Sequence, residues 1–239
     1  MGSDGRSKKG EMQPFDRPLP TEELSTQELK EAFHATRVRD ALCVPLLDRY
    51  ADQTPYRFVL DQSQQPLDAV DVYFSEAEPC FHYVGWGMSE VGEKRSVNDE
   101  ISGWGFELMF RLATTRDQRR GHPKRLDGTL ADNAPSWPVD LLVSLCQLVE
   151  KTRRGFCADD FVEIADWAYG SRRAALLRAE GEPLHTPNGQ MRFLLVEVIS
   201  AEQLLLLKRA YSDDLSYRQL LKAIRYRLPP ASADYRSGR

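Results

Sequence analysis

The sequence lacks the features that mark membrane-spanning and exported chains. No apolar run reaches the roughly 20 residues that a transmembrane helix needs. The first 20 residues are rich in charged and small side chains and contain no apolar core of a secretion signal. The position at which a myristoylation signal requires Ser or Thr holds Arg6. We therefore expect a cytoplasmic protein without a membrane partner.

The sequence also has little excess charge and few cysteines. Its formal net charge is −4, whereas dedicated nucleic-acid binders usually carry a strong basic excess. The four cysteines show no CxxC spacing, so we expect buried free thiols and no disulfide framework. The four histidines are scattered without metal-ligand spacing. These patterns predict neither a metal site nor a cofactor.

The sequence motifs of common enzyme classes are missing as well. There is no GxxxxGK[ST] phosphate loop, no GxSxG nucleophile turn and no HExxH zinc motif. One enzymatic alternative stays open, because Cys80 and His82 point to the same face of an expected strand. They could serve as the nucleophile and base of a hydrolase, but the sequence identifies no orienting acid and no oxyanion hole.

A second alternative is nucleic-acid binding through the basic loop 116–125. The loop carries five basic residues, and Arg153, Arg154, Arg172 and Arg173 could extend its surface. Such a surface would give binding with a steep salt dependence. A solvated loop is the simpler interpretation, because the chain shows no wider basic region.

Period-two apolar alternation and turn residues predict the strands of the chain. They indicate strands at 56–60, 68–75, 80–87, 101–115 and 186–200. Residues 158–180 contain runs too short to distinguish a helix from a strand.

Helix-capping patterns predict the helices. One begins at Ser25, where Glu28 completes a capping box, and either kinks at Pro45 or is divided near residues 34–37. A second runs from Ser136 to Gly155, and Ser200 caps the first of two C-terminal helices. The mixture predicts an α+β fold. We expect a single domain over 25–227, with a disordered lead-in at 1–24 and a flexible tail at 228–239.

The stretch "ISGWGFELMFRLATT" at 101–115 has two unusual faces. Apolar side chains alternate on one face, at Trp104, Phe106, Leu108, Phe110 and Leu112. The other face carries Gly103, Gly105, Glu107, Met109 and Arg111. Glu107 and Arg111 lie about 13 Å apart along an extended strand, so each needs another partner, on a neighbouring strand or in a ligand. Glycine within a strand often marks the close approach of another backbone.

Five motifs occur in an order that resembles a known family. They are "PLDAVDVYFS", "HYVGWGMSE", "SGWGFELMFRL", "SWPVDLLVSLCQLV" and "TPNGQMRFLLVEVISAEQL". In this order and with these gaps, over about residues 40–210, the chain resembles the Suppressor of fused domain family. The resemblance implies an α+β domain with mixed sheets flanked by helices, and a protein-binding module without enzymatic activity.

The resemblance also implies a kind of partner. In the animal member of the family, the domain holds Gli transcription factors by accepting a peptide as an added strand. Bacterial relatives occur as stand-alone domains, and many are inferred to be immunity proteins that neutralise polymorphic toxins. This chain ends soon after the matching region, so we expect the stand-alone bacterial type, with a protein partner that could be a toxin domain.

The residues that the resemblance assigns to partner binding lie in two strands and one loop. The family holds its peptide beside the strands that match 104–112 and 191–199, and an acid in the preceding loop matches Asp99. We expect partner contacts at Asp99, Gly103, Trp104, Gly105, Glu107, Arg111 and Arg192. Leu195 replaces a family Gln, Val198 replaces a family Gly, and the loop 116–125 is longer than in the animal protein. A Gli-like ligand is therefore not expected.

Overall fold

The computed structural model describes most of the region that the sequence assigns to the domain. It covers residues 26–50, 53–60, 66–75, 78–90, 98, 100–113, 134–164 and 173–227, with only the backbone described for 26–36 and 39. The expected lead-in, the tail, Asp99 and the basic loop 116–125 lie outside these residues. None of the helices described is long and apolar enough to cross a membrane.

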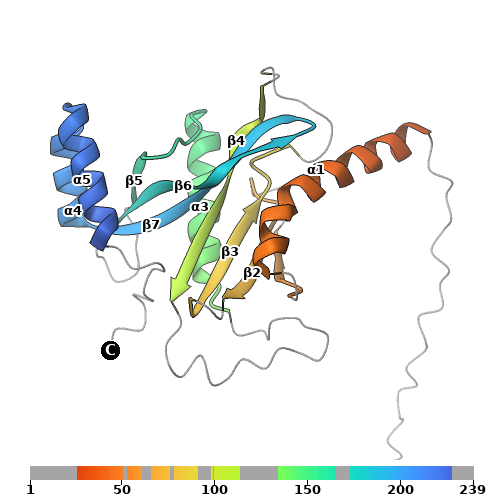
Figure 1. Cartoon of the computed structure of the whole chain (residues 1–239), viewed down its shortest axis with the longest axis horizontal. Helices are drawn as coiled ribbons and strands as arrows, with labels where there is room; N and C mark the ends of the chain where they lie inside the picture. Colours follow the sequence, from red (N-terminus) through yellow and green to blue (C-terminus); the bar gives the residue numbers. More distant parts are fainter. Residues whose placement is uncertain are drawn as a thin grey trace, which may run out of the picture.

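A mixed seven-stranded sheet forms the centre of the molecule (Figure 1). Its strands are β1 (Tyr56–Val59), β2 (Ala69–Ser75), β3 (Cys80–Trp86), β4 (Ile101–Ala113), β5 (Phe161–Ile164), β6 (Arg173–Thr186) and β7 (Gly189–Ser200). Their order across the sheet is β1-β2-β3-β4-β7-β6-β5. The pair β4–β7 is parallel, and the other neighbouring pairs are antiparallel. The α+β class expected from the sequence is confirmed.

One face of the sheet packs against helix α3 (Trp137–Thr152). The alternating apolar residues of β4 point to this side, where Phe106, Leu108 and Phe110 are almost completely buried. Leu142, Leu145 and Val149 of α3 belong to the same cluster. The period-two pattern therefore predicts the buried face of β4 correctly, and the structure shows that α3 covers it.

The opposite face of β4 is also covered, by helix α1 (Thr26–Tyr50). Val38, Leu42, Leu46 and Tyr50 of α1 pack against Met109 of β4 and against residues of β3 and β7. Pro45 lies inside this single helix. The second face of β4, which the sequence leaves open, is thus an interior surface at Met109.

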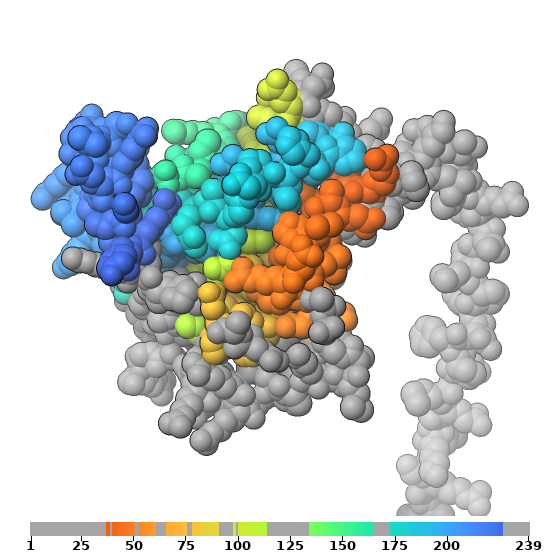
Figure 2. All heavy atoms as spheres, viewed as in Figure 1, coloured from red at the N-terminus to blue at the C-terminus, as the bar shows by residue number. Residues whose placement is uncertain are grey.

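Helices α4 (Ala201–Ala210) and α5 (Asp214–Arg227) cover the far end of the same face as α1. Phe193 and Leu195 of β7 contact the α1 cluster and Ile199 contacts the α4–α5 cluster, and odd-numbered residues of a strand share one face. In Figure 2 the surface of β6 and β7 separates α1 from α5. Ser200 caps α4, as its sequence position predicts, and it forms a capping box with Gln203.

Strands β5 and β6 are the elements that the sequence leaves undefined. The run Ala174–Leu177 in β6 is completely buried, because its alternate residues pack against α3 on one side and against α4–α5 on the other. A strand buried on both faces shows no alternation of apolar and polar residues. The sequence pattern therefore could not distinguish β6 from a helix.

Candidate functional site

The parallel pairing of β4 with β7 is interrupted near the start of β4. Ile101 pairs with Gln190, and pairing resumes at Phe106 with Arg192. Residues 102–105 therefore stand opposite Met191 alone. Extra residues in one strand form a bulge, which bends the strand and redirects its side chains.

Two glycines make this bulge possible. Gly103 and Gly105 have φ values of 56° and 80°, in the left-handed region that residues with a Cβ rarely adopt. A Cβ at Gly103 would lie 2.5 Å from the carbonyl oxygen of Met88. The close backbone approach that glycine in a strand predicts is confirmed at Gly103, where the approaching backbone is the chain's own turn after β3. At Gly105 the nearest atom to a Cβ would instead belong to the side chain of Ile101.

Glu107 holds that turn in place. Its side chain is completely buried, and its carboxylate accepts hydrogen bonds from the backbone N–H groups of Gly87, Met88 and Ser89 and from the Ser89 hydroxyl. Burial raises the pKa of Glu107 to about 7, although these hydrogen bonds act to lower it. Glu107, which the sequence assigns to a partner, has its own partners inside the chain.

Arg111 likewise pairs inside the molecule. Its buried guanidinium contacts Glu180 of β6. Glu180 also receives Arg49 of α1 at 3.4 Å and Arg178 at 3.5 Å. As the spacing along the strand predicts, Glu107 and Arg111 do not pair with each other. Their partners lie in the turn after β3 and in β6, and not on a neighbouring strand as expected. Arg111 lies 6% exposed beneath α1.

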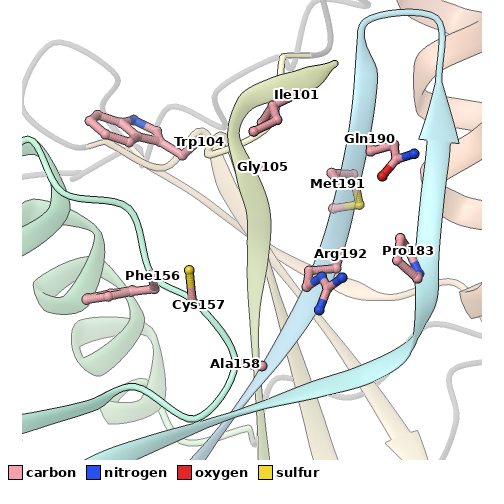
Figure 3. Close-up of a pocket in the computed structure, with 10 residues that line it drawn as sticks. All are labelled: Ile101, Trp104, Gly105, Phe156, Cys157, Ala158, Pro183, Gln190, Met191 and Arg192. Atoms are coloured by element: carbon pink, nitrogen blue, oxygen red, sulfur yellow. The ribbon is translucent and has the colours of Figure 1, made fainter. Parts of the chain in front are cut away.

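A pocket of about 250 Å³ opens beside the bulge (Figure 3). Its walls come from β4, β7, the segment after α3, and Pro183 of β6. The lining residues are Ile101, Trp104, Gly105, Phe156, Cys157, Ala158, Pro183, Gln190, Met191 and Arg192. The pocket thus has a mainly apolar lining and one cationic side chain, a combination suited to an apolar group next to a carboxylate.

The expected site residues divide into three groups. Trp104, Gly105 and Arg192 meet at the pocket, whereas Gly103 lies beneath the turn at 88–90 and Glu107 and Arg111 are buried elsewhere. Asp99 is outside the described residues. No sequence pattern marks Phe156 and Cys157, because only the fold brings the chain after α3 to the β4 bulge.

Cys80 and His82 lack the environment of a nucleophile and its base. Both are buried, and burial raises the pKa of the Cys80 thiol to about 11. Burial, with Arg111 and Arg49, lowers the pKa of His82 well below its ordinary value. Nδ1 of His82 shares a hydrogen bond of 2.8 Å with the Tyr50 hydroxyl. This arrangement favours a neutral thiol, whereas a reactive cysteine is a thiolate.

The described residues contain no group of three or more His, Cys, Asp or Glu side chains that could hold a metal ion.

The fold and the site together define an α+β domain with a surface pocket at an interrupted parallel strand pair. Residues 63–229 match the family model of the Suppressor of fused protein (SUFU), and the chain belongs to this family. No curated protein matches the chain.

Two solved structures share the fold. A chain of the Sufu–Fu complex crystal structure is 23% identical, with a TM-score of 0.64, and the match covers 79% of this chain and 84% of that one. Drosophila Suppressor of Fused is also 23% identical, with a TM-score of 0.61 and 72% of this chain covered. The chain spans only 44% of the length of the Drosophila protein.

The contact between the turn and the bulge predicts a large cost for a methyl group at residue 103. Gly103→Ala adds a Cβ at 2.5 Å from a backbone oxygen. Gly181→Ala is the matched control, because Gly181 also has a positive φ but no atom within 4 Å of its Cβ position. We expect the control to lose about 1 kcal/mol of unfolding free energy from backbone strain. Gly103→Ala should lose ~1–3 kcal/mol more from overpacking. Urea unfolding measures both, and equal losses would contradict the contact.

The cysteines provide a test of the hydrolase alternative. Iodoacetamide near neutral pH should alkylate exposed Cys157 first and leave buried Cys80 and Cys146 unmodified until urea unfolds the chain. Mass spectrometry of the digested protein gives the rate at each site. A Cys80 rate equal to that of Cys157 would show a reactive thiol and would revive the hydrolase interpretation.

Proposed function

We propose that this chain is a protein-binding domain that captures an extended segment of a protein partner at the β4–β7 site. The interrupted pairing at residues 102–105, beside an open pocket, is the observation that carries the proposal. Membership of the Suppressor of fused family and the fold shared with a chain of the Sufu–Fu complex support it. Partner binding by strand or peptide capture then requires no catalytic residue.

The lining of the pocket indicates the chemistry of the captured segment. Trp104, Phe156 and Met191 offer an apolar surface to one side chain of the partner. Arg192 lines the same pocket, and no ion pair joins it to another residue that the structure describes. A guanidinium in this position favours a carboxylate. We therefore propose a partner segment in which an apolar residue stands next to Asp or Glu.

We further propose that the partner is a toxin domain and that the chain acts as its immunity protein in the cytoplasm. The support is membership of the Suppressor of fused family, many bacterial members of which are inferred to have this role. Immunity by binding needs only that the complex masks the toxic surface. A strand-capture site can provide such a complex through main-chain hydrogen bonds and side-chain pockets.

A charge reversal at Arg192 tests the peptide-binding proposal. Selection of random peptides on phage with the wild-type chain should enrich sequences that contain an apolar residue beside Asp or Glu. With Arg192→Glu, the acidic preference should change to Lys or Arg, because the pocket would then hold a carboxylate. Arg218→Glu makes the same charge change on an exposed part of α5 and should select the wild-type motif. If the wild type and both variants selected the same motif, the peptide would bind at a site other than the Arg192 pocket.

The immunity proposal has a separate test in living cells. If a toxin is encoded next to this gene, its co-expression with the wild-type chain should restore growth. Arg192→Glu should restore growth less well, whereas Arg218→Glu should protect as the wild type does. Growth curves after toxin induction measure protection. Toxicity that the wild-type chain does not relieve would count against the immunity role and leave peptide binding to be judged by the phage selection.

A further inference from the structure

We propose that Glu107 is a positioning residue for the β4–β7 site, because its ionised carboxylate fixes the Gly87–Ser89 turn against which Trp104 is held. Loss of that negative charge should loosen the turn and weaken partner binding. This inference rests on the proposed function for its effect on binding. Its effect on the structure of the turn can be measured without any partner.

The contacts of Glu107 are concentrated on the turn. Oε1 accepts hydrogen bonds from the N–H groups of Gly87 at 3.2 Å and Ser89 at 2.8 Å, and from the Ser89 hydroxyl at 2.6 Å. Oε2 accepts one from the Met88 N–H at 3.2 Å. Three successive backbone donors thus converge on one carboxylate. The conformation of the turn depends on an acceptor at this position.

The Gly87–Ser89 turn also contacts the walls of the pocket. The carbonyl oxygen of Met88 accepts a hydrogen bond of 2.8 Å from the backbone N–H of Trp104 in the bulge. Two residues further on, the backbone N–H of Glu90 donates to the Ser102 hydroxyl at 3.1 Å, and its carbonyl oxygen accepts from the Asn188 side chain at 2.9 Å. Asn188 lies between β6 and β7. A shift of the turn would therefore move both sides of the pocket entrance.

Protonation of Glu107 would conflict with this arrangement. A carboxylate accepts hydrogen bonds at both oxygens, whereas a carboxylic acid carries a proton that must itself be donated. The three N–H groups of the turn that contact Glu107 cannot accept this proton, and the Ser89 hydroxyl can accept it only by giving up the hydrogen bond that it donates to the carboxylate. Protonation therefore breaks or reverses at least one of these hydrogen bonds and leaves a neutral carboxyl, which holds the N–H groups of the turn less strongly than the carboxylate does.

The surroundings of Glu107 place this change near neutral pH. Burial raises its pKa to about 7. The turn brings no charged side chain at Gly87, Met88 or Ser89, and Phe193 is the residue of β7 paired with Glu107. From α3, Cys146 is the titratable neighbour, and burial, Glu107 and Glu150 raise the pKa of its thiol well above the ordinary value. Cys146 therefore stays neutral across this range.

The direction of the pH effect differs between binding and stability. Partner binding uses the ionised form, so affinity should fall by about tenfold for each pH unit below the pKa. The free energy of unfolding should change in the opposite sense, because a raised pKa means that the folded state binds the proton more tightly than the unfolded state. The stabilising contribution is complete below the ordinary pKa of 4.5 and is lost as pH rises through about 7. If Glu107 served only the stability of the fold, its protonation would stabilise the fold without weakening partner binding.

The first test follows the backbone amide resonance of Trp104 by NMR in the full chain, between about pH 5 and about pH 8. We expect it to titrate with a midpoint near the pKa of Glu107, and Glu107→Gln should abolish the titration. Ser89→Ala should raise the midpoint by about one pH unit, since it removes a hydrogen bond that favours the ionised form. This second variant keeps the test decisive if Glu107→Gln does not fold. Glu90→Gln, which leaves Glu107 in place, should titrate as the wild type does.

A Trp104 resonance that does not titrate in the wild type, or a midpoint that Ser89→Ala leaves unchanged, would overturn the proposal.

The second test measures the affinity of a peptide selected by the wild-type chain over the same pH range. Affinity should fall below the midpoint in the wild type, and the fall should follow the raised midpoint in Ser89→Ala. A pH-independent affinity would overturn the positioning role. The absence of any selected peptide would instead reject the proposed function, while the NMR result would still decide whether Glu107 controls the turn.

Discussion

The burial of residues 106–112 of β4 on both faces is the constraint on which the rest of the structure depends. β4 lies between an antiparallel neighbour, β3, and a parallel neighbour, β7. Parallel pairs are stable where helices cover both sides of the sheet. α3 supplies one cover and α1 the other. Any charged residue of β4 must therefore find its counterpart inside the protein, which is why Glu107 binds the turn after β3 and Arg111 binds Glu180.

Sequence patterns were sufficient for the elements with one clear apolar face and recognisable ends. The alternation in β4 and the cap at Ser200 both correspond to observed contacts. β6 could not be predicted in the same way, because its residues at 174–177 are apolar on both sides. The number of layers that cover a strand is a property of the whole fold. A local window of sequence does not contain it.

The candidate site was predictable only where it coincides with a recognisable motif. Trp104 and Arg192 lie in two motifs of the family and do reach the pocket. Phe156 and Cys157 reach it from a segment that has no motif of its own. Glu107 also lies in a motif, but it does not line the pocket. It accepts three backbone hydrogen bonds inside the chain, which no spacing rule reveals. A conspicuous polar residue in a strand can serve the fold as readily as a ligand.

The distribution of strand lengths has a consequence for self-association. The two outermost strands, β1 and β5, have 4 residues each, whereas β4 and β6 in the interior have 13 and 14. A long exposed edge is a template on which other chains can add strands without control. Here the sheet ends in short edges, and the longest rows of main-chain groups are already occupied by neighbours. Edges this short offer little template for fibril growth, which leaves strand addition to whatever site the interior of the sheet provides.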